Sequence, residues 1–343
     1  MRFLVVGGGL MGCAVAWELV RRGQRVTVLE RAVPGAEASS AAAGILAPRV
    51  EAHGQEPARS HGIRSLALYP EWVQAIEGAT GLGCGLWASG LYRVVGEGED
   101  PEQSRPDADA LWRTDLPPGL SHVSGAWWLP EEGSVEPPRL VTAVRQAAER
   151  AGVHFVTGVP VRRVGRAGVE LEGGGELSGK PIVCAGAWTG KVEGIPPLPV
   201  RPVRGQVMEL RAQPGALEQV VFCKGGYIVP RRDGRVLVGA TMEEVGFERG
   251  VTPKGMAYLA EVVRHGAPWL ADMPLVRSWS NFRPASPDGY PMLGEVEGVY
   301  VVSGHHRNGI LLAPLTAVAV AGALVEGRPV PTGWELERFL PRS

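Results

Sequence analysis

The stretch MRFLVVGGGLMGCAVAWELVRRGQRVTVLE, from Met1 to Glu30, decides the fold. The continuous apolar run Phe3 to Val6 is typical of a central parallel strand that is buried on both faces. It leads into the turn Gly7-Gly8-Gly9-Leu10-Met11-Gly12, a helix predicted from Leu10 to Arg22, and a second strand at Arg25 to Glu30. This order of strand, glycine turn, helix and strand predicts an α/β fold that binds a dinucleotide.

Three glycines of the turn have separate tasks. Gly7 allows a tight turn, Gly9 lets the main chain approach a pyrophosphate, and Gly12 lets the helix pack closely on the sheet. The amino end of the helix then faces the phosphate charge. Glu30 is placed to accept hydrogen bonds from a ribose. A purely structural glycine turn is the alternative, but the context favours dinucleotide binding, and the motif alone leaves NAD and FAD both open.

Length and charge limit the classes of partner. The chain has 343 residues, 45% of them hydrophobic, with a net charge of -1, so we expect two domains and no nucleic acid partner. The apolar run Ile310 to Val325 contains Pro314 and is shorter than the ~20 residues of a bilayer span, so it predicts a buried helix and no membrane association. The amino terminus lacks the apolar region of a signal peptide, so we expect none.

The cysteines indicate the compartment. They show no CxxC spacing and lie in apolar or glycine-rich stretches, so we expect buried free thiols in a reducing cytoplasm and no nucleophile among them. The four are Cys13, Cys84, Cys184 and Cys223.

Metal and hydrolase chemistry are poorly supported. His305 and His306 are adjacent, which is not the helical i, i+4 spacing of paired metal ligands, so we expect no metal site. Ser39 and Ser40 are not part of a GxSxG elbow, so the sequence does not indicate a serine hydrolase.

The chain is predicted to leave the first domain and return to it. Strands near Val153 to Val156 and Pro181 to Ala185 read as returns to the first sheet, whereas Arg201 to Ala285 is a second β-rich block. In that block Arg232-Asp233-Gly234 is a hairpin turn. We therefore expect one discontinuous dinucleotide domain and one substrate domain. The first comprises residues 1–85, 136–200 and 286–343, and the second comprises residues 86–135 and 201–285.

Several blocks, in order along the chain, resemble the D-amino acid oxidase superfamily of FAD-dependent oxidoreductases, and within it the glycine oxidases. The resemblance extends from Gly7 to about Leu324. It implies a Rossmann-like FAD-binding domain of the glutathione-reductase type and a second substrate domain with a mixed sheet. The blocks are Ser39 to Gly44, Cys184 to Thr189, Tyr227 to Pro230, Val238 to Met242 and Gly304 to Pro314.

The resemblance also implies an activity. An amine next to a carboxylate, in glycine, sarcosine or a small D-amino acid, would be oxidised to the imine while O2 is reduced to H2O2, in support of thiazole synthesis for thiamine. No cysteine matches those that attach flavin in some relatives, so we expect non-covalent FAD. Relatives suggest a homo-oligomer. Two alternatives stay open: a dehydrogenase that uses another electron acceptor, and a non-catalytic dinucleotide-binding sensor.

Two residues match the family's carboxylate-binding pair. The rigid fork of an arginine suits a planar carboxylate, and Arg283 stands at the family's position for it. Tyr227 would donate a further hydrogen bond. An ordinary surface ion pair and a sheet aromatic are the alternatives. Arg307 is expected to have a secondary role, in which its carbonyl receives the substrate amine and its side chain closes the site.

The pocket walls are expected to favour a small substrate. Ile45 and Met242 match wall residues of the family, with plain core packing as the alternative. His306 stands where glycine oxidases commonly have a bulky aromatic residue, and Gly225 and Gly226 are small where a relative can have larger groups. These departures predict a more polar wall and leave the pocket size open.

The remaining residues implied by the resemblance would hold FAD. A helix that starts near Gly309 is expected to present its first amides to the flavin and to stabilise negative charge there. The FAD contacts are Gly7, Gly9, Leu10, Met11, Gly12, Glu30, Arg31, Ser39, Ser40, Ala43, Gly44, Val161, Ala185, Gly186, Trp188, Asn308, Gly309, Ile310 and Leu311.

Overall fold

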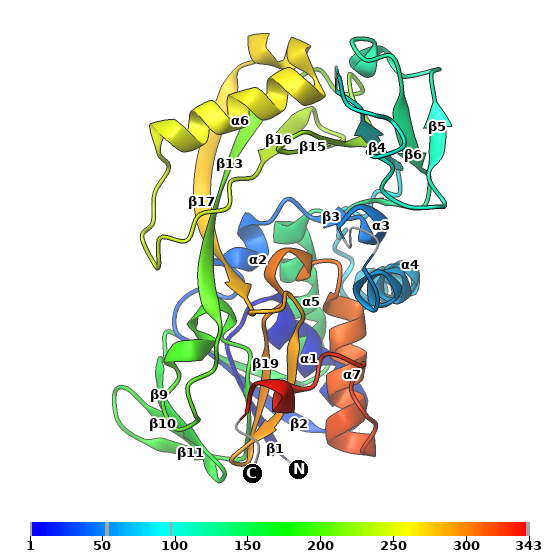
Figure 1. Cartoon of the computed structure of the whole chain (residues 1–343). Coiled ribbons are helices and arrows are strands. Elements are labelled where there is room, and N and C mark those ends of the chain that lie inside the picture. Colours follow the sequence, from blue (N-terminus) through cyan, green and yellow to red (C-terminus); the bar gives the residue numbers. More distant parts are fainter. Residues whose placement is uncertain (1, 52–54, 97, 341–343) are drawn as a thin grey trace.

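The computed structural model describes residues 2–51, 55–96 and 98–340, and arranges them around two large sheets (Figure 1). The first sheet has six strands, with neighbours parallel apart from the antiparallel pair β18–β19. In spatial order they are β18 (Met292–Val296), β19 (Val299–Ser303), β12 (Lys180–Val183), β1 (Arg2–Val6), β2 (Arg25–Glu30) and β8 (His154–Thr157).

Helices pack on one face of this sheet. Phe3 and Val5 of β1 share an apolar core with buried side chains of these helices, among them Val15 and Trp72. The helices are α1 (Leu10–Arg21), α4 (Ala58–Thr80), α5 (Pro137–Arg150) and α7 (Ala313–Glu326). A small antiparallel sheet covers the opposite face, where Leu4 of β1 shares a core with Val164. Its strands are β9 (Val161–Gly165), β10 (Gly168–Leu171) and β11 (Glu176–Ser178).

The second sheet has eight strands and is mixed, because β14 and β4 are parallel while the other neighbours are antiparallel. Helix α6 (Pro253–Gly266) covers its outer face, and the long strands β13 and β17 run from it alongside the other half of the molecule (Figure 1). In order the strands are β17 (Leu275–Ala285), β13 (Arg201–Arg211), β16 (Arg235–Gly239), β15 (Gly226–Pro230), β14 (Val220–Cys223), β4 (Leu91–Val94), β6 (Ala126–Leu129) and β5 (Leu111–Arg113).

Short elements join the two halves. The strands β3 (Ile45–Leu46) and β7 (Gly133–Ser134) pair with each other, and the short helices α2 (Ala38–Ala41) and α3 (Pro48–Glu51) flank β3 along the chain. The short 3-10 helices are η1 (Pro118–Leu120), η2 (Gly186–Lys191), η3 (Pro268–Asp272), η4 (His306–Asn308) and η5 (Leu336–Phe339).

The predicted mixed α/β fold is confirmed, and one predicted helix start is wrong. Helix α7 begins at Ala313 and not near Gly309, because η4 and a further turn precede it. The strands of each large sheet fall inside the ranges predicted for its domain, whereas the domain limits themselves stay a prediction.

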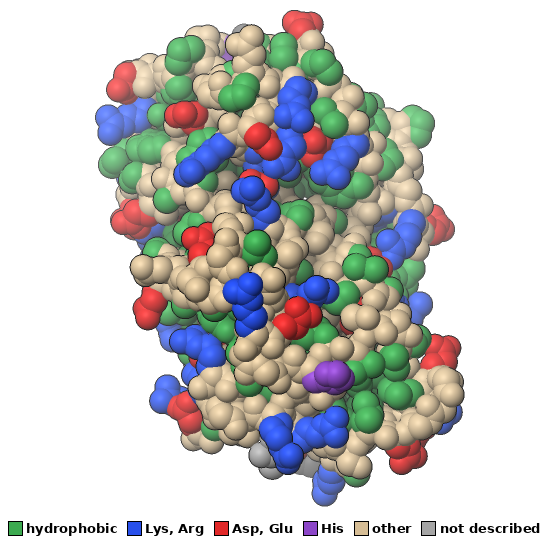
Figure 2. Space-filling model, turned by 180° about the vertical axis from the view of Figure 1, so that it is seen from behind, with side chains coloured by type: hydrophobic (Ala, Val, Ile, Leu, Met, Phe, Trp, Pro, Cys, Tyr) green, Lys and Arg blue, Asp and Glu red, His purple; other side chains and the backbone are tan. Residues whose placement is uncertain are grey.

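The surface agrees with a nearly balanced charge. Basic and acidic side chains are interspersed over the face seen in Figure 2 and form no large patch of one sign there. No helix in the described ranges is both long and apolar enough to cross a bilayer.

Candidate functional site

One cavity of about 1360 Å³ extends across the molecule and is lined by residues of both sheets. At one end lie the glycine turn after β1 and Glu30 at the end of β2. At the other end lie Tyr227 of β15 and Arg283 near the end of β17. The carboxyl ends of parallel strands in an open α/β sheet are the usual place for a dinucleotide.

The glycines of the turn are required by close contacts of the backbone. Gly7 has φ 111°, and a Cβ there would lie 2.4 Å from the Cys184 carbonyl oxygen. A Cβ on Gly12 would lie 1.9 Å from the Gly7 carbonyl oxygen. Gly12 does not line the cavity, so its observed task is close packing of α1.

Polar groups around the turn leave hydrogen-bond donors free for an anion. The Leu10 amide donates to Ser39 Oγ at 2.9 Å, while the amides of Met11 and Gly12 have no acceptor in the described part of the chain. The Glu30 carboxylate accepts from the Gly8 amide at 2.7 Å. Free amides at a helix amino terminus fit a pyrophosphate.

The two side chains predicted to bind a carboxylate each lie across a glycine of the neighbouring strand. A Cβ on Gly205 of β13 would lie 2.4 Å from Arg283 Nη1, and one on Gly239 of β16 would lie 2.5 Å from Tyr227 Cε2. Arg283 Nη1 also donates to the Thr241 carbonyl oxygen at 3.1 Å. Burial raises the pKa of Tyr227, and the charge of Arg283 opposes that rise. The two side chains are therefore close, and the phenol remains a proton donor.

Arg307 makes an ion pair that the sequence does not reveal. Its Nε lies 2.9 Å from Glu51 Oε2 and its Nη2 donates to Glu51 Oε1 at 3.0 Å. The Glu51 side chain is 10% exposed, and Glu51 lines the cavity with Arg307 and Met242. Arg307 Nη1 also lies 3.8 Å from Met242 Sδ. The Arg307 charge is thus neutralised by Glu51, whereas Arg283 forms no ion pair with a described residue.

The two histidines are uncharged near neutral pH. Burial lowers the pKa of His306 to about 4 and that of His305 to about 3. His306 lines the cavity, and its Nε2 is buried with no hydrogen-bond partner among the described residues. His305 Nε2 lies 3.0 Å from Thr316 Oγ1 of α7, so His305 connects the turn to the helix.

The turn after η4 presents its amides to the cavity. Gly309 and Ile310 line the cavity, and the amides of residues 309–311 have no acceptor within the described ranges. Helix α4 holds the carbonyls of this turn from the other side, because Tyr69 Oη donates to Ile310 O at 2.5 Å and Ser65 Oγ donates to Leu311 O at 2.7 Å. Amides without an acceptor in the protein indicate that a bound ligand supplies the acceptor atoms.

Comparison with known proteins now decides the family. The model of the FAD-dependent oxidoreductases, DAO, matches residues 2–323. The chain belongs to this family. Its free amides, its glycine turn and the size of its cavity fit FAD, with Gly9, Met11 and Glu30 at the dinucleotide end.

The similar proteins include glycine oxidases and a bifunctional ThiO/ThiG protein. Glycine oxidase of Geobacillus kaustophilus is 35% identical over 98% of this chain and 95% of its own length. A glycine oxidase structure from that organism matches with a TM-score of 0.88, 33% identity and 98% of each chain covered. The bifunctional protein ThiO/ThiG of Trichormus variabilis is 37% identical over 96% of this chain and 53% of its own length, so the chain spans about half of that relative.

Most residues assigned by resemblance line the cavity of this family member. Ser40 and Leu311 do not line it, and neither does Gly12. The individual roles of all assigned residues stay predictions. The wall residues Ile45, Met242 and His306 lie on the cavity, as do Arg31, Ala43, Gly44, Val161, Ala185, Gly186, Trp188 and Asn308.

The cysteines are buried free thiols. Burial raises the pKa of Cys13, Cys84 and Cys223 to about 12, so none of these three is a thiolate at neutral pH. In the described part of the chain no three His, Cys, Asp or Glu side chains are grouped as metal ligands.

Proposed function

We propose that this protein is an FAD-dependent amino acid oxidase that converts glycine, or sarcosine or a small D-amino acid, to the imine with reduction of O2 to H2O2. The observation that carries the proposal is the pair Arg283 and Tyr227 in the same cavity as the dinucleotide end. Arg283 has no carboxylate partner in the described part of the chain and lies beside a protonated phenol, so it is suited to the carboxylate of an amino acid.

The residues of the chain bind and orient the substrate. Arg283 and Tyr227 hold the carboxylate. The ion pair of Arg307 with Glu51 has no net charge. Neither of these side chains therefore strongly attracts the carboxylate or the amine of a zwitterionic substrate away from Arg283 and Tyr227. The Arg307 carbonyl receives the substrate amine, and His306 forms part of the pocket wall. FAD, when bound, supplies the electron acceptor for the Cα–H bond and passes the electrons to O2. Positioning is then the main task of the protein.

The test uses purified protein loaded with FAD. Anaerobic mixing with glycine should bleach the oxidised flavin absorbance, and admission of air should restore it with formation of one H2O2 for each amine oxidised. Sarcosine and D-alanine are tested in parallel, with L-alanine as a control. The variant Arg283→Ala should retain FAD and lose most of the bleaching.

The possible results separate the alternatives. If none of the small amino acids bleaches the flavin, the proposal is wrong and a non-catalytic sensor is favoured. Rapid bleaching with little peroxide under air would identify a dehydrogenase that needs another acceptor.

We also propose that FAD is bound non-covalently, that the reaction supplies thiazole synthesis for thiamine, that the protein is cytoplasmic and that it forms a homo-oligomer. Release of flavin on denaturation tests the non-covalent binding. Light scattering tests the oligomeric state.

A further inference from the structure

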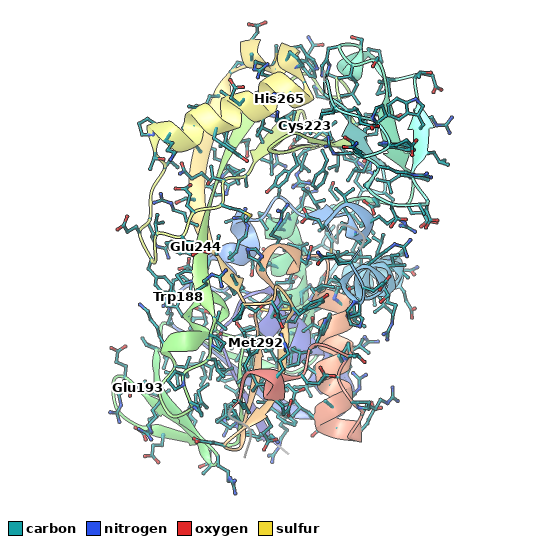
Figure 3. The ribbon with its side chains drawn as sticks, in the orientation of Figure 1. Trp188, Glu193, Cys223, Glu244, His265 and Met292 are labelled. Carbon is teal, nitrogen blue, oxygen red and sulfur yellow. The ribbon has the colours of Figure 1, made fainter. Side chains whose placement is uncertain are left out.

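A loop of the eight-stranded sheet crosses to the other half of the molecule. We call residues 243–250, between β16 and α6, the strap. It is tied to the sheet by two hydrogen bonds between the backbones of Arg204 and Glu243, at 2.9 and 3.0 Å, and by the Gly250 amide, which donates to Ser280 Oγ at 3.1 Å. Figure 3 shows Glu244, at the start of the strap, directly above Trp188 of η2.

The tip of the strap packs on an aromatic cluster. The ring centroid of Phe247 lies 5.1 Å from that of Trp188 and 5.4 Å from that of Phe282. Lys191 Nζ lies 4.1 Å above the Phe247 ring. Since Trp188 and Lys191 line the cavity and Phe247 does not, the strap lies behind the cavity wall.

Arg249 closes a ring of four side chains from three segments, because Arg31 and Glu37 both lie in the connection between β2 and α2. Its Nη2 lies 2.7 and 2.8 Å from the two oxygens of Glu37, and its guanidinium carbon lies 5.9 Å from the Trp188 ring. Arg31 makes the matching contacts from the other side, with its guanidinium carbon 4.1 Å from the Trp188 ring and its Nη2 3.4 Å from Glu37 Oε1. Of the four residues, Arg249 alone comes from the half that contains the eight-stranded sheet.

The ring lies over the dinucleotide end of the cavity. Arg31, Glu37 and Trp188 line the cavity, and Arg31 directly follows Glu30. Glu37 lies two residues before Ser39, whose hydroxyl accepts from the Leu10 amide at the glycine turn. Displacement of this ring would therefore open the wall beside the place where FAD is held.

We propose that Arg249 is a positioning residue that fixes Glu37, Arg31 and Trp188 over the bound FAD and slows release of the cofactor. The inference rests on membership of an FAD-dependent family and not on the choice of substrate. The Arg249 side chain is 53% exposed, so its ion pair alone contributes little to holding the ring of four side chains in place. The ion pair and the cation–π contact act together. Loss of both should raise the rate of FAD release about three- to tenfold.

The experiment measures FAD release after dilution of the loaded protein, from the recovery of free flavin fluorescence. It compares the wild type, Arg249→Ala, Glu37→Gln and the double variant. Arg21→Ala is the control, because Arg21 is 49% exposed, pairs with Glu18 at 3.3 Å and lies 4.7 Å over the Trp17 ring, and it is not among the residues that line the cavity. Melting of the FAD-free forms reports any purely structural effect.

We expect Arg249→Ala to release FAD faster, the control to match the wild type, and the two single changes to be non-additive because they break one interaction. Added salt should speed release from the wild type more than from Arg249→Ala. Equal release from Arg249→Ala and the control would overturn the proposal. So would an equal loss of melting temperature with and without FAD, since that result describes a residue that stabilises only the fold. A wild type that binds no FAD would contradict the family assignment as well.

Discussion

Arg283 and Arg307 both line the cavity, but of these two only Arg307 has a carboxylate partner among the described residues. We predict that Arg283→Ala lowers kcat/KM for glycine by about 100-fold, because a charge-assisted hydrogen-bonded pair with the substrate is lost. Arg307→Ala should lower it by about tenfold or less, since Glu51 already neutralises that guanidinium.

Steady-state peroxide formation measures both variants, with retention of FAD checked by absorbance. Arg277→Ala is the control, because Arg277 is not among the residues that line the cavity. The reverse order of the two effects would show that Arg307 is the carboxylate-binding residue.

His305 should make the free energy of unfolding depend on pH. The folded protein keeps this histidine neutral because burial lowers its pKa to about 3, whereas the unfolded chain takes up the proton near the ordinary value of 6.5. The unfolded state therefore binds more protons below pH 6.5, and the free energy of unfolding falls as pH decreases through that window.

The variant His305→Gln should remove up to about 1.4 kcal/mol of this loss per pH unit. Urea unfolding at pH 7, 6 and 5 (about one pH unit apart) measures the slope. His265→Gln, on α6 (Figure 3), is the control. An unchanged slope in His305→Gln would show that the histidine is not kept neutral.

The sequence predicts single residues well only where a local motif defines them. Gly7, Gly9 and Glu30 stand in one short unit, so their spacing is informative. Glu51 is separated from Arg307 by 256 residues, and no periodicity connects the two. A pair of that kind becomes visible only when the tertiary fold brings its members together.

At the level of elements, α4 supports the site without lining the cavity at Tyr69 or Ser65. Their hydroxyls donate hydrogen bonds to the carbonyls of residues 310 and 311 and so fix the orientation of the turn. The amides of residues 309–311 are then free to bind FAD. We predict that Tyr69→Phe weakens FAD binding about fivefold, the equivalent of one hydrogen bond, with little change in the KM for glycine.

Flavin fluorescence titration measures this effect. Tyr92→Phe, in β4, is the control, because Tyr92 is not on the cavity lining. Equal FAD affinity in Tyr69→Phe and the wild type would show that the turn holds its geometry without α4.

Two kinds of element escaped the sequence analysis for different reasons. Helix α6 has visible signals, since Thr252 caps it by accepting from the Gly255 amide at 3.1 Å and Pro253 opens its first turn. The sequence around α6 is rich in predicted strands, so the whole range from Arg201 to Ala285 is predicted as a β-rich block. The strands β9 to β11 are short and partly exposed, so their apolar pattern is too weak to define them.

For the whole molecule, the position of the cavity between the two sheets implies that FAD contributes to global stability. We predict that FAD at 100 times its dissociation constant adds about 2.7 kcal/mol to the free energy of unfolding. The melting temperature should rise with the logarithm of FAD concentration. Calorimetry at several FAD concentrations measures it, with riboflavin, which lacks the dinucleotide, as the control.

A melting temperature independent of FAD would contradict binding in this cavity. The chain order predicted that later strands return to the sheet of the glycine turn, and β8 and β12 do lie in the same six-stranded sheet as β1. How the halves lie against each other depends on contacts such as Arg249 with Glu37, which no local pattern encodes.

The strands β13 and β17 pair along almost their whole length, from Arg201 with Ala285 to Leu210 with Leu275. One end of this ribbon pairs with β16 in the eight-stranded sheet, and the other end lies beside the six-stranded half (Figure 1). A ribbon of two hydrogen-bonded strands resists bending far more than a single-stranded linker does. We therefore expect no hinge opening of the two halves during turnover, so that substrate exchange depends on local movement of loops around the mouth of the cavity.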